Sequence, residues 1–273
     1  MSATLNTTAG AALVYDGKGP MGLGRILRAY LQETRYEFLQ ALRAPAFAFP
    51  FLLLPAPLYF LFGVVMAGSS PEALKNPELA NFVFAGWCAF AVMGPAIFGV
   101  GLGLAFERDS GTLKLKRALP APPGAHLIAK MLMAMAFAAL ALSTVTVAAL
   151  IAGAITLSPG ALATLLFVMI VGAVPFCAIG LFIGAFASSG AAPAFGNLAY
   201  LPGIWLSGIF IPLPEALRPW AVIWPAFHLD QAALGFAGVT SFSFMSPLTS
   251  TGVLVGITVL FGGLALRRVT RVG

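Results

Sequence analysis

Few residues of this chain carry groups that could do acid–base, nucleophilic or metal chemistry. Its two histidines, His126 and His228, are far apart in the sequence and lack the spacing of metal ligands. His228 and Asp230 form a His-x-Asp pair near Trp224, either a proton-sensitive or substrate-contacting pair or the polar edge of an interfacial helix. No G-x-x-x-x-G-K-[S/T] phosphate loop is present, so the chain shows no site for using ATP itself. We therefore expect a protein that is not an enzyme and binds no cofactor or metal of its own.

The densest group of chemically active residues is the segment Glu107–Arg117 (ERDSGTLKLKR), which separates two long hydrophobic runs. Ser110 and Gly111 can end a helix and let the chain turn. Leucines then alternate with basic residues, as in a short amphipathic helix, and the proline-rich stretch 120–123 ends that element. The segment therefore predicts a short charged helix outside the hydrophobic part of the protein.

The elements that position this segment are membrane spans. The chain has 273 residues, of which 60% are hydrophobic and 9% charged, whereas soluble domains carry about 25% charged residues. No Asp, Glu, Lys or Arg occurs from Met131 to Pro214. This is expected of membrane-spanning helices, because a charge at the centre of such a helix raises the free energy of membrane insertion by about 2.5–3.5 kcal/mol. The composition predicts an all-α, polytopic membrane protein. The shortage of ionisable residues at mid-membrane argues against an ion-coupled secondary transporter.

Segments of about 20 apolar residues predict six transmembrane helices, at 46–67, 81–106, 126–153, 161–187, 194–211 and 248–266. Residues 212–247 are too long and apolar for an ordinary loop and predict re-entrant or interfacial helices on the exterior side, between spans five and six. We interpret residues 1–21 as a flexible lead without a cleaved signal peptide, 46–266 as the transmembrane domain and 267–273 as a tail.

The distribution of basic residues predicts the orientation. With six spans both termini lie on one side, together with all but two of the 15 Lys and Arg residues, the exceptions being Lys75 and Arg218. The positive-inside rule then makes the termini and the loop 107–124 cytoplasmic. The basic residues behind the net charge of +6 lie at the membrane edges, where they set the orientation. We therefore expect no nucleic-acid partner.

The segment 22–45 precedes the first span and has the hydrophobic periodicity of an amphipathic helix. Its apolar positions recur at helical spacing and its basic positions fall on another face. We expect it to lie in the cytoplasmic headgroup layer, in contact with membrane lipid, or else to extend the first span into the cytoplasm. The apolar positions include Leu31 and Phe38, and the basic ones Arg28 and Arg35.

Two groups of residues resemble type-2 ATP-binding-cassette (ABC) export permeases. The first is Glu107-Arg108-x-x-Gly111-Thr112-Leu113, then Pro120, then Lys130-Met131-Leu132. The second is Leu206-Ser207-Gly208-Ile209-Phe210-Ile211-Pro212, then Leu217, Pro219-Trp220, Pro225 and His228-Leu229. The resemblance covers roughly residues 22–266.

This resemblance implies a permease subunit that moves a substrate out across the inner (cytoplasmic) membrane of a bacterium. It further implies two permease copies, or one copy and a close relative, docked on two separate ATPase subunits that bind ATP and Mg²⁺. The coupling residues would be Glu107, Arg108, Gly111, Thr112, Leu113, Lys114, Lys116 and Arg117. The substrate pathway or re-entrant region would include Leu206, Ser207, Gly208, Phe210, Pro212, Pro225 and His228.

Three points stay open. The family often has acidic or apolar residues where Lys114, Lys116 and Arg117 stand, so these cations either meet an acidic groove on the ATPase or merely enforce topology. The substrate could be a drug, a lipid, a polysaccharide or an ion. The alternatives to an ATP-driven exporter are a non-transporting membrane anchor or assembly factor for a cytosolic partner, and a secondary transporter.

Overall fold

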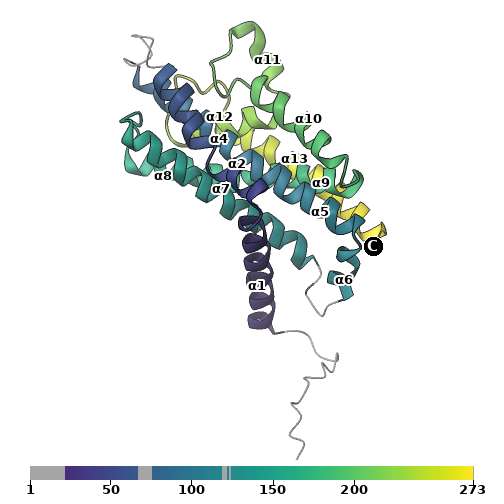
Figure 1. Ribbon diagram of the computed structural model, residues 1–273. Coiled ribbons are helices and arrows are strands. Elements are labelled where there is room, and N and C mark those ends of the chain that lie inside the picture. Colours follow the sequence, from purple (N-terminus) through teal and green to yellow (C-terminus); the bar gives the residue numbers. More distant parts are fainter. Residues whose placement is uncertain (1–21, 67–75, 119–121, 123, 273) are drawn as a thin grey trace, which may run out of the picture.

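The computed structural model describes residues 22–66, 76–118, 122 and 124–272, and within these ranges every regular element is a helix. The lead expected at 1–21 lies outside the described residues. Figure 1 shows a bundle of long helices from which one helix, α1 (Leu23–Leu42), extends away at an angle.

Prolines break the chain that follows α1 into short helical pieces. They are α2 (Pro45–Leu52), α3 (Pro55–Leu58) and the π-helical η1 (Tyr59–Met66). Proline lacks a backbone N–H and fixes φ, so it suits the start of a helix and disrupts its interior. Together these pieces form the first apolar span, Pro45–Met66.

The next three spans are longer and more buried. The second combines α4 (Pro77–Gly94), η2 (Pro95–Gly99) and α5 (Val100–Asp109). After the short α6 (Thr112–Ala118), the third span is α7 (Ala125–Ile151). The fourth span combines α8 (Pro159–Val171) and α9 (Ala173–Phe186).

The C-terminal part holds five elements. They are α10 (Ala192–Trp205), η3 (Glu215–Leu217), α11 (Arg218–Ala221), α12 (Pro225–Phe236) and α13 (Pro247–Val272). Within the described residues, five helical segments are long and apolar enough to cross a membrane, and α10 is not among them. Its 14 residues rise about 21 Å, short of the hydrocarbon core of about 30 Å. A multi-pass helical membrane protein is thus confirmed, while the sixth span, the interfacial position of α1 and the membrane depth of 212–247 stay predictions.

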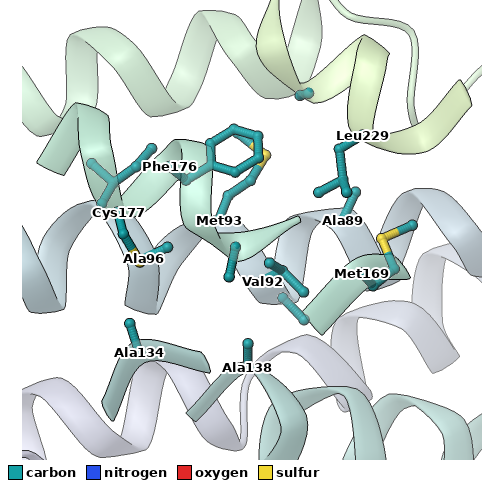
Figure 2. Close-up of a cluster of buried hydrophobic side chains, with 14 of the residues drawn as sticks. Ala89, Val92, Met93, Ala96, Ala134, Ala138, Met169, Phe176, Cys177 and Leu229 are labelled. Carbon is teal, nitrogen blue, oxygen red and sulfur yellow. The ribbon is translucent and has the colours of Figure 1, made fainter. Parts of the chain in front are cut away.

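The core lies where α4 and η2 meet α7, α8, α9 and α12. Figure 2 shows that small side chains face one another across these helices and let them approach closely, while a few larger ones fill the remaining space. The residues labelled there are Ala89, Val92, Met93, Ala96, Ala134, Ala138, Met169, Phe176, Cys177 and Leu229.

A glycine seam joins η2 and α5 to α9 even more closely. A Cβ atom on Gly184 would lie 2.5 Å from the carbonyl oxygen of Gly101, and one on Gly180 would lie 2.7 Å from that of Ile97. Both distances are far below normal contact, so side chains larger than hydrogen are excluded there. In contrast, a Cβ on Gly252 of α13 would meet nothing within 4 Å. The seam fixes the second span against the fourth.

Candidate functional site

The charged segment singled out by the sequence, Glu107–Arg117, forms the end of α5, a turn and most of α6. α5 ends at Asp109, and Gly111 has a φ of 77°, in the left-handed region that favours glycine. The hydroxyls of Ser110 and Thr112 lie 2.9 Å apart and close the turn. Ser110 and Gly111 therefore end the helix as expected, and α6 starts at once.

A cluster of buried ion pairs lies directly behind α6. Lys116 Nζ contacts Glu37 Oε1 at 2.5 Å and Glu107 Oε1 at 2.9 Å. Lys130 Nζ contacts Glu37 Oε2 at 2.7 Å and Glu107 Oε1 at 2.9 Å. Glu33 adds a more exposed contact to Lys116 at 3.1 Å. We call Glu37, Glu107, Lys116 and Lys130 the ion-pair cluster.

The ion-pair cluster connects four helices that are distant in sequence. Glu37 lies on α1, Glu107 on α5, Lys116 on α6 and Lys130 on α7. Lys130 is 2% exposed, and both carboxylates are also buried. Gly103 of α5 leaves the room for this ammonium group, because a Cβ there would lie 3.3 Å from Lys130 Nζ. Since a buried charge is tolerated only with partners, the cluster holds α6 in one position relative to the other three helices.

The pKa values of the two groups outside the spans reflect this pairing. Burial alone would raise the pKa of Glu37, but Lys130 and Lys116 outweigh it and hold the pKa below its ordinary value. Burial alone would lower the pKa of Lys116, but Glu37 and Glu107 outweigh it and raise the pKa above its ordinary value. Both side chains are therefore charged at neutral pH.

Arg108 joins the same turn to the end of α9. Its guanidinium donates to the carbonyl oxygens of Gly184 at 3.0 Å, Ala185 at 2.6 Å and Ala187 at 2.7 Å. These carbonyls are at the C-terminus of a helix, where backbone acceptors lack helical partners. Asp109 extends the link, because its Oδ2 accepts from the backbone N–H of Ser189 at 2.6 Å. The turn is therefore connected to the fourth span as well as to α1 and α7.

The two faces of α6 differ in character. Leu113 is 3% exposed and packs inward, and Lys116 belongs to the ion-pair cluster. Lys114 and Leu115 point outward, and Leu115 is 71% exposed. The side chain of Arg117 lies outside the described residues. Of the basic residues expected to meet a partner, Lys114 is available and Lys116 already has acidic partners within the chain.

A cavity of about 610 Å³ opens beside α6, bounded by α1, the start of α7 and the end of α13. Its walls include polar side chains such as Gln32, Glu33 and Tyr36 of α1, and Thr270 of α13. This cavity lies beside α6, near the C-terminal end of α13.

In α1, which covers most of residues 22–45, one part of the expected apolar face is packed and another part is exposed. Phe38 packs against Phe137 of α7, with ring centroids 5.1 Å apart. Leu27 and Leu31, on the same apolar face, are exposed, and so are Arg28 and Arg35 on another face. The first half of α1 thus presents an apolar surface that no described part of the chain covers.

The second group of predicted residues forms a turn rather than a regular span. Leu206 to Pro212 follow α10 and reverse the chain at Gly208, whose φ is 74°. Ser207 is buried. The ring of Phe210 contacts Trp87 of α4 at 4.6 Å and Trp205 of α10 at 6.0 Å between centroids. This turn is therefore packed on the second span through aromatic side chains.

Pro225 and His228 belong to α12, where Pro225 is the first residue. His228 is buried, and its Nε2 lies 2.8 Å from the carbonyl oxygen of Val222. Asp230 is buried separately, as expected because residues two apart on a helix do not face each other. Within the described residues no hydrogen bond or ion pair joins His228 to Asp230, and both side chains are buried rather than at the polar edge of a helix.

Two members of the ion-pair cluster were not among the coupling residues expected from the sequence. Lys130 is one of the basic residues from which the orientation is predicted, yet it lies inside the predicted span 126–153, and an ionisable residue there requires a partner. Glu37 gave a weaker signal, as one of several charges on an amphipathic helix. Its partners are 79 and 93 residues away, a separation that helical periodicity does not connect.

Two comparisons with known proteins show which family the chain belongs to. The family model described as ABC-2 type transporter matches residues 29–244, from α1 to the segment before α13. A Bacillus subtilis (strain 168) protein named "Putative transport permease YvfS" is 25% identical over 207 residues, which is 74% of this chain and 82% of that protein. The matched region contains α6, the whole ion-pair cluster and the turn after α10. The chain therefore belongs to the ABC-2 type transporter family and is a membrane subunit of a transporter.

Proposed function

We propose that this chain is the permease subunit of an ATP-driven exporter, paired with a second permease copy or a close relative. Two separate ATPase subunits bind ATP and Mg²⁺ and supply the energy. The observation that carries this proposal is α6, a short helix held by the ion-pair cluster while Lys114 and Leu115 face outward. Such a helix can receive a force from a partner and pass it to the spans.

The contacts of α6 define the route of this force. Lys116 connects α6 to Glu37 of α1 and, through Glu107, to the second span. Lys130 continues the connection to the third span, and Arg108 continues it to the fourth. Because charged pairs in a buried site hold their geometry, a displacement of α6 moves these helices together rather than bending the turn.

The membrane arrangement completes the proposal. Both termini and α6 face the cytoplasm of a bacterium, and α10 is a short fifth span that ends at the turn 206–212. Residues 212–247, with η3, α11 and α12, lie at the exterior side, and the exposed apolar face of α1 lies in the headgroup layer. The excess of basic residues at the termini and around α6 supports this orientation.

The substrate pathway lies between the two permease copies, along the second span and α10. Trp87, Trp205 and Phe210 are clustered there, and Trp205 is exposed. Aromatic rings at this position favour a substrate with apolar or planar parts, such as an amphiphilic drug, a lipid or a lipid-linked molecule.

Reconstitution with the cognate ATPase tests the proposal. We expect the chain to stimulate ATP hydrolysis in proteoliposomes, and we expect the Lys114→Glu variant to lose ATPase binding. Lys116 is unsuitable for charge reversal because a third carboxylate would then face the buried Glu37 and Glu107. Arg271→Glu, at the end of α13, is the matched control. An anchor protein would bind the ATPase without stimulating it, and a secondary transporter would give gradient-driven flux without any ATPase.

A further inference from the structure

A second, smaller pocket lies on the other side of α6, between the ends of α5, α9 and α13. Its volume is about 240 Å³. Three cationic side chains line it, namely Arg108, Lys114 and Arg268, and its walls are the apolar side chains of Leu113, Ala185 and Val269. A pocket that combines cations with apolar walls suits the headgroup region of an anionic amphiphile.

The positive charge of this pocket is not neutralised within the chain. Asp109, its one acidic lining residue, has its oxygens bonded to Arg108 at 3.1 Å and to the Ser189 N–H at 2.6 Å. Lys114 and Arg268 are both exposed, and neither forms an ion pair with an acidic side chain of the described chain. Two cations are thus free to bind an external anion.

The surroundings indicate that the anion is attached to a lipid. The pocket lies at the ends of three membrane-spanning segments, α5, α9 and α13. Phe106 and Phe186, near those ends, are exposed large apolar side chains, and Arg268 lies over the ring of Phe186 at 5.6 Å. A free phosphate ion would use the cations alone, whereas a phospholipid would also contact these rings with its acyl chains.

We propose that this pocket binds the phosphate group of an anionic phospholipid, with Lys114 and Arg268 as its ligands. The phosphate bridges α6 to the last turns of α13, a link that the ion-pair cluster does not make. The site is built from the permease chain alone, but Lys114 also faces the ATPase in the proposed function; Arg268→Gln separates the two proposals, because it should weaken lipid binding and leave ATPase binding unchanged.

Native mass spectrometry of the purified full-length chain tests this proposal. The chain is released from micelles containing phosphatidylglycerol or phosphatidylcholine, and retained lipid is counted. We expect selective retention of phosphatidylglycerol, and a loss in affinity of about fivefold for each of Lys114→Gln and Arg268→Gln, the equivalent of about 1 kcal/mol per cation near a membrane surface. Arg271→Gln is the control, because it removes an exposed α13 cation that does not line the pocket.

Three results would overturn the proposal: equal retention of the two lipids, a loss in the control as large as in the pocket variants, or displacement of phosphatidylglycerol by excess inorganic phosphate. The last result would assign the site to free phosphate. Because both pocket residues are exposed, we expect each single variant to fold, and an unchanged tryptophan fluorescence spectrum checks this.

Discussion

Replacing Lys130 with methionine removes one cation from the ion-pair cluster while keeping a side chain of similar length. The ammonium group of Lys130 lies 2.7 Å from Glu37 Oε2 and 2.9 Å from Glu107 Oε1, and its side chain is 3% exposed. In the Lys130→Met variant, Lys116 remains as the cation beside two buried carboxylates. We therefore expect a large loss of stability.

The magnitude follows from burial and from the number of partners. Removing one member of a buried ion pair costs about 3–5 kcal/mol, because the charge left behind keeps its desolvation penalty. Exposed charges away from such features change stability by about 0.5 kcal/mol or less. Lys114→Met on the outer face of α6 is the matched control, since Lys114 is exposed. We expect Lys130→Met to exceed this control by about 3 kcal/mol.

Unfolding in mixed micelles, followed by the fluorescence of the 4 tryptophans, measures both variants. The double variant Lys130→Met with Glu37→Gln completes a mutant cycle, and we expect a coupling energy of about 1–3 kcal/mol between the two sites. Equal stability of Lys130→Met and Lys114→Met, or strict additivity in the cycle, would refute the role of the ion-pair cluster.

Three further predictions follow from the same geometry. Because the pKa of Glu37 is lowered in the folded state, its stabilising contribution is present above its unfolded pKa of about 4.3 and is lost as pH falls through the folded pKa. The stability difference between the wild type and Glu37→Gln should therefore be constant from neutral pH to about pH 5 and shrink below about pH 4. A decline that starts near neutral pH would contradict this. Gly184→Ala would place a Cβ 2.5 Å from a carbonyl oxygen of α5, so it should lower the stability by about 1–3 kcal/mol in the same unfolding assay. Gly252 has open space around it, so Gly252→Ala should leave the stability unchanged or raise it by up to about 1 kcal/mol. Gly111→Ala forces alanine to a φ of 77° at a cost of about 1–2 kcal/mol. We therefore expect this variant to stimulate the ATPase more weakly while its membrane insertion is unchanged. Full stimulation would show that the turn tolerates another conformation.

The membrane class and most helix positions could be predicted from the sequence because they depend on local composition. The apolar run predicted at 126–153 is α7, and the turn predicted at Ser110 and Gly111 is present. The extent of the fifth predicted span was harder to predict from the sequence. Pro202 is incorporated near the end of α10, but the helix stops at Trp205, and the remaining residues form a turn packed on Trp87. Hydropathy alone cannot distinguish such a turn from a continuing span.

The charged residues of the site illustrate a different limit. The sequence identified Glu107, Arg108 and Lys116 as a group, because they are close together in the chain. It did not indicate that Lys116 turns inward, since that depends on Glu37 and Lys130 brought together by the packing of α1 on α7. The assignment of Lys114 as the available cation depends on this tertiary contact.

Site-specific photo-crosslinking at Leu115 tests the central claim most directly. Leu115 is the most exposed large apolar side chain of α6, and a crosslinking amino acid there should leave the ion-pair cluster intact. In cells that express the chain with its cognate ATPase, we predict a covalent adduct between position 115 and the ATPase. The same probe at Phe167, an exposed residue of α8, should give none. Absence of the ATPase adduct at position 115, with normal expression and membrane insertion, would contradict the role of α6 as the site of energy input.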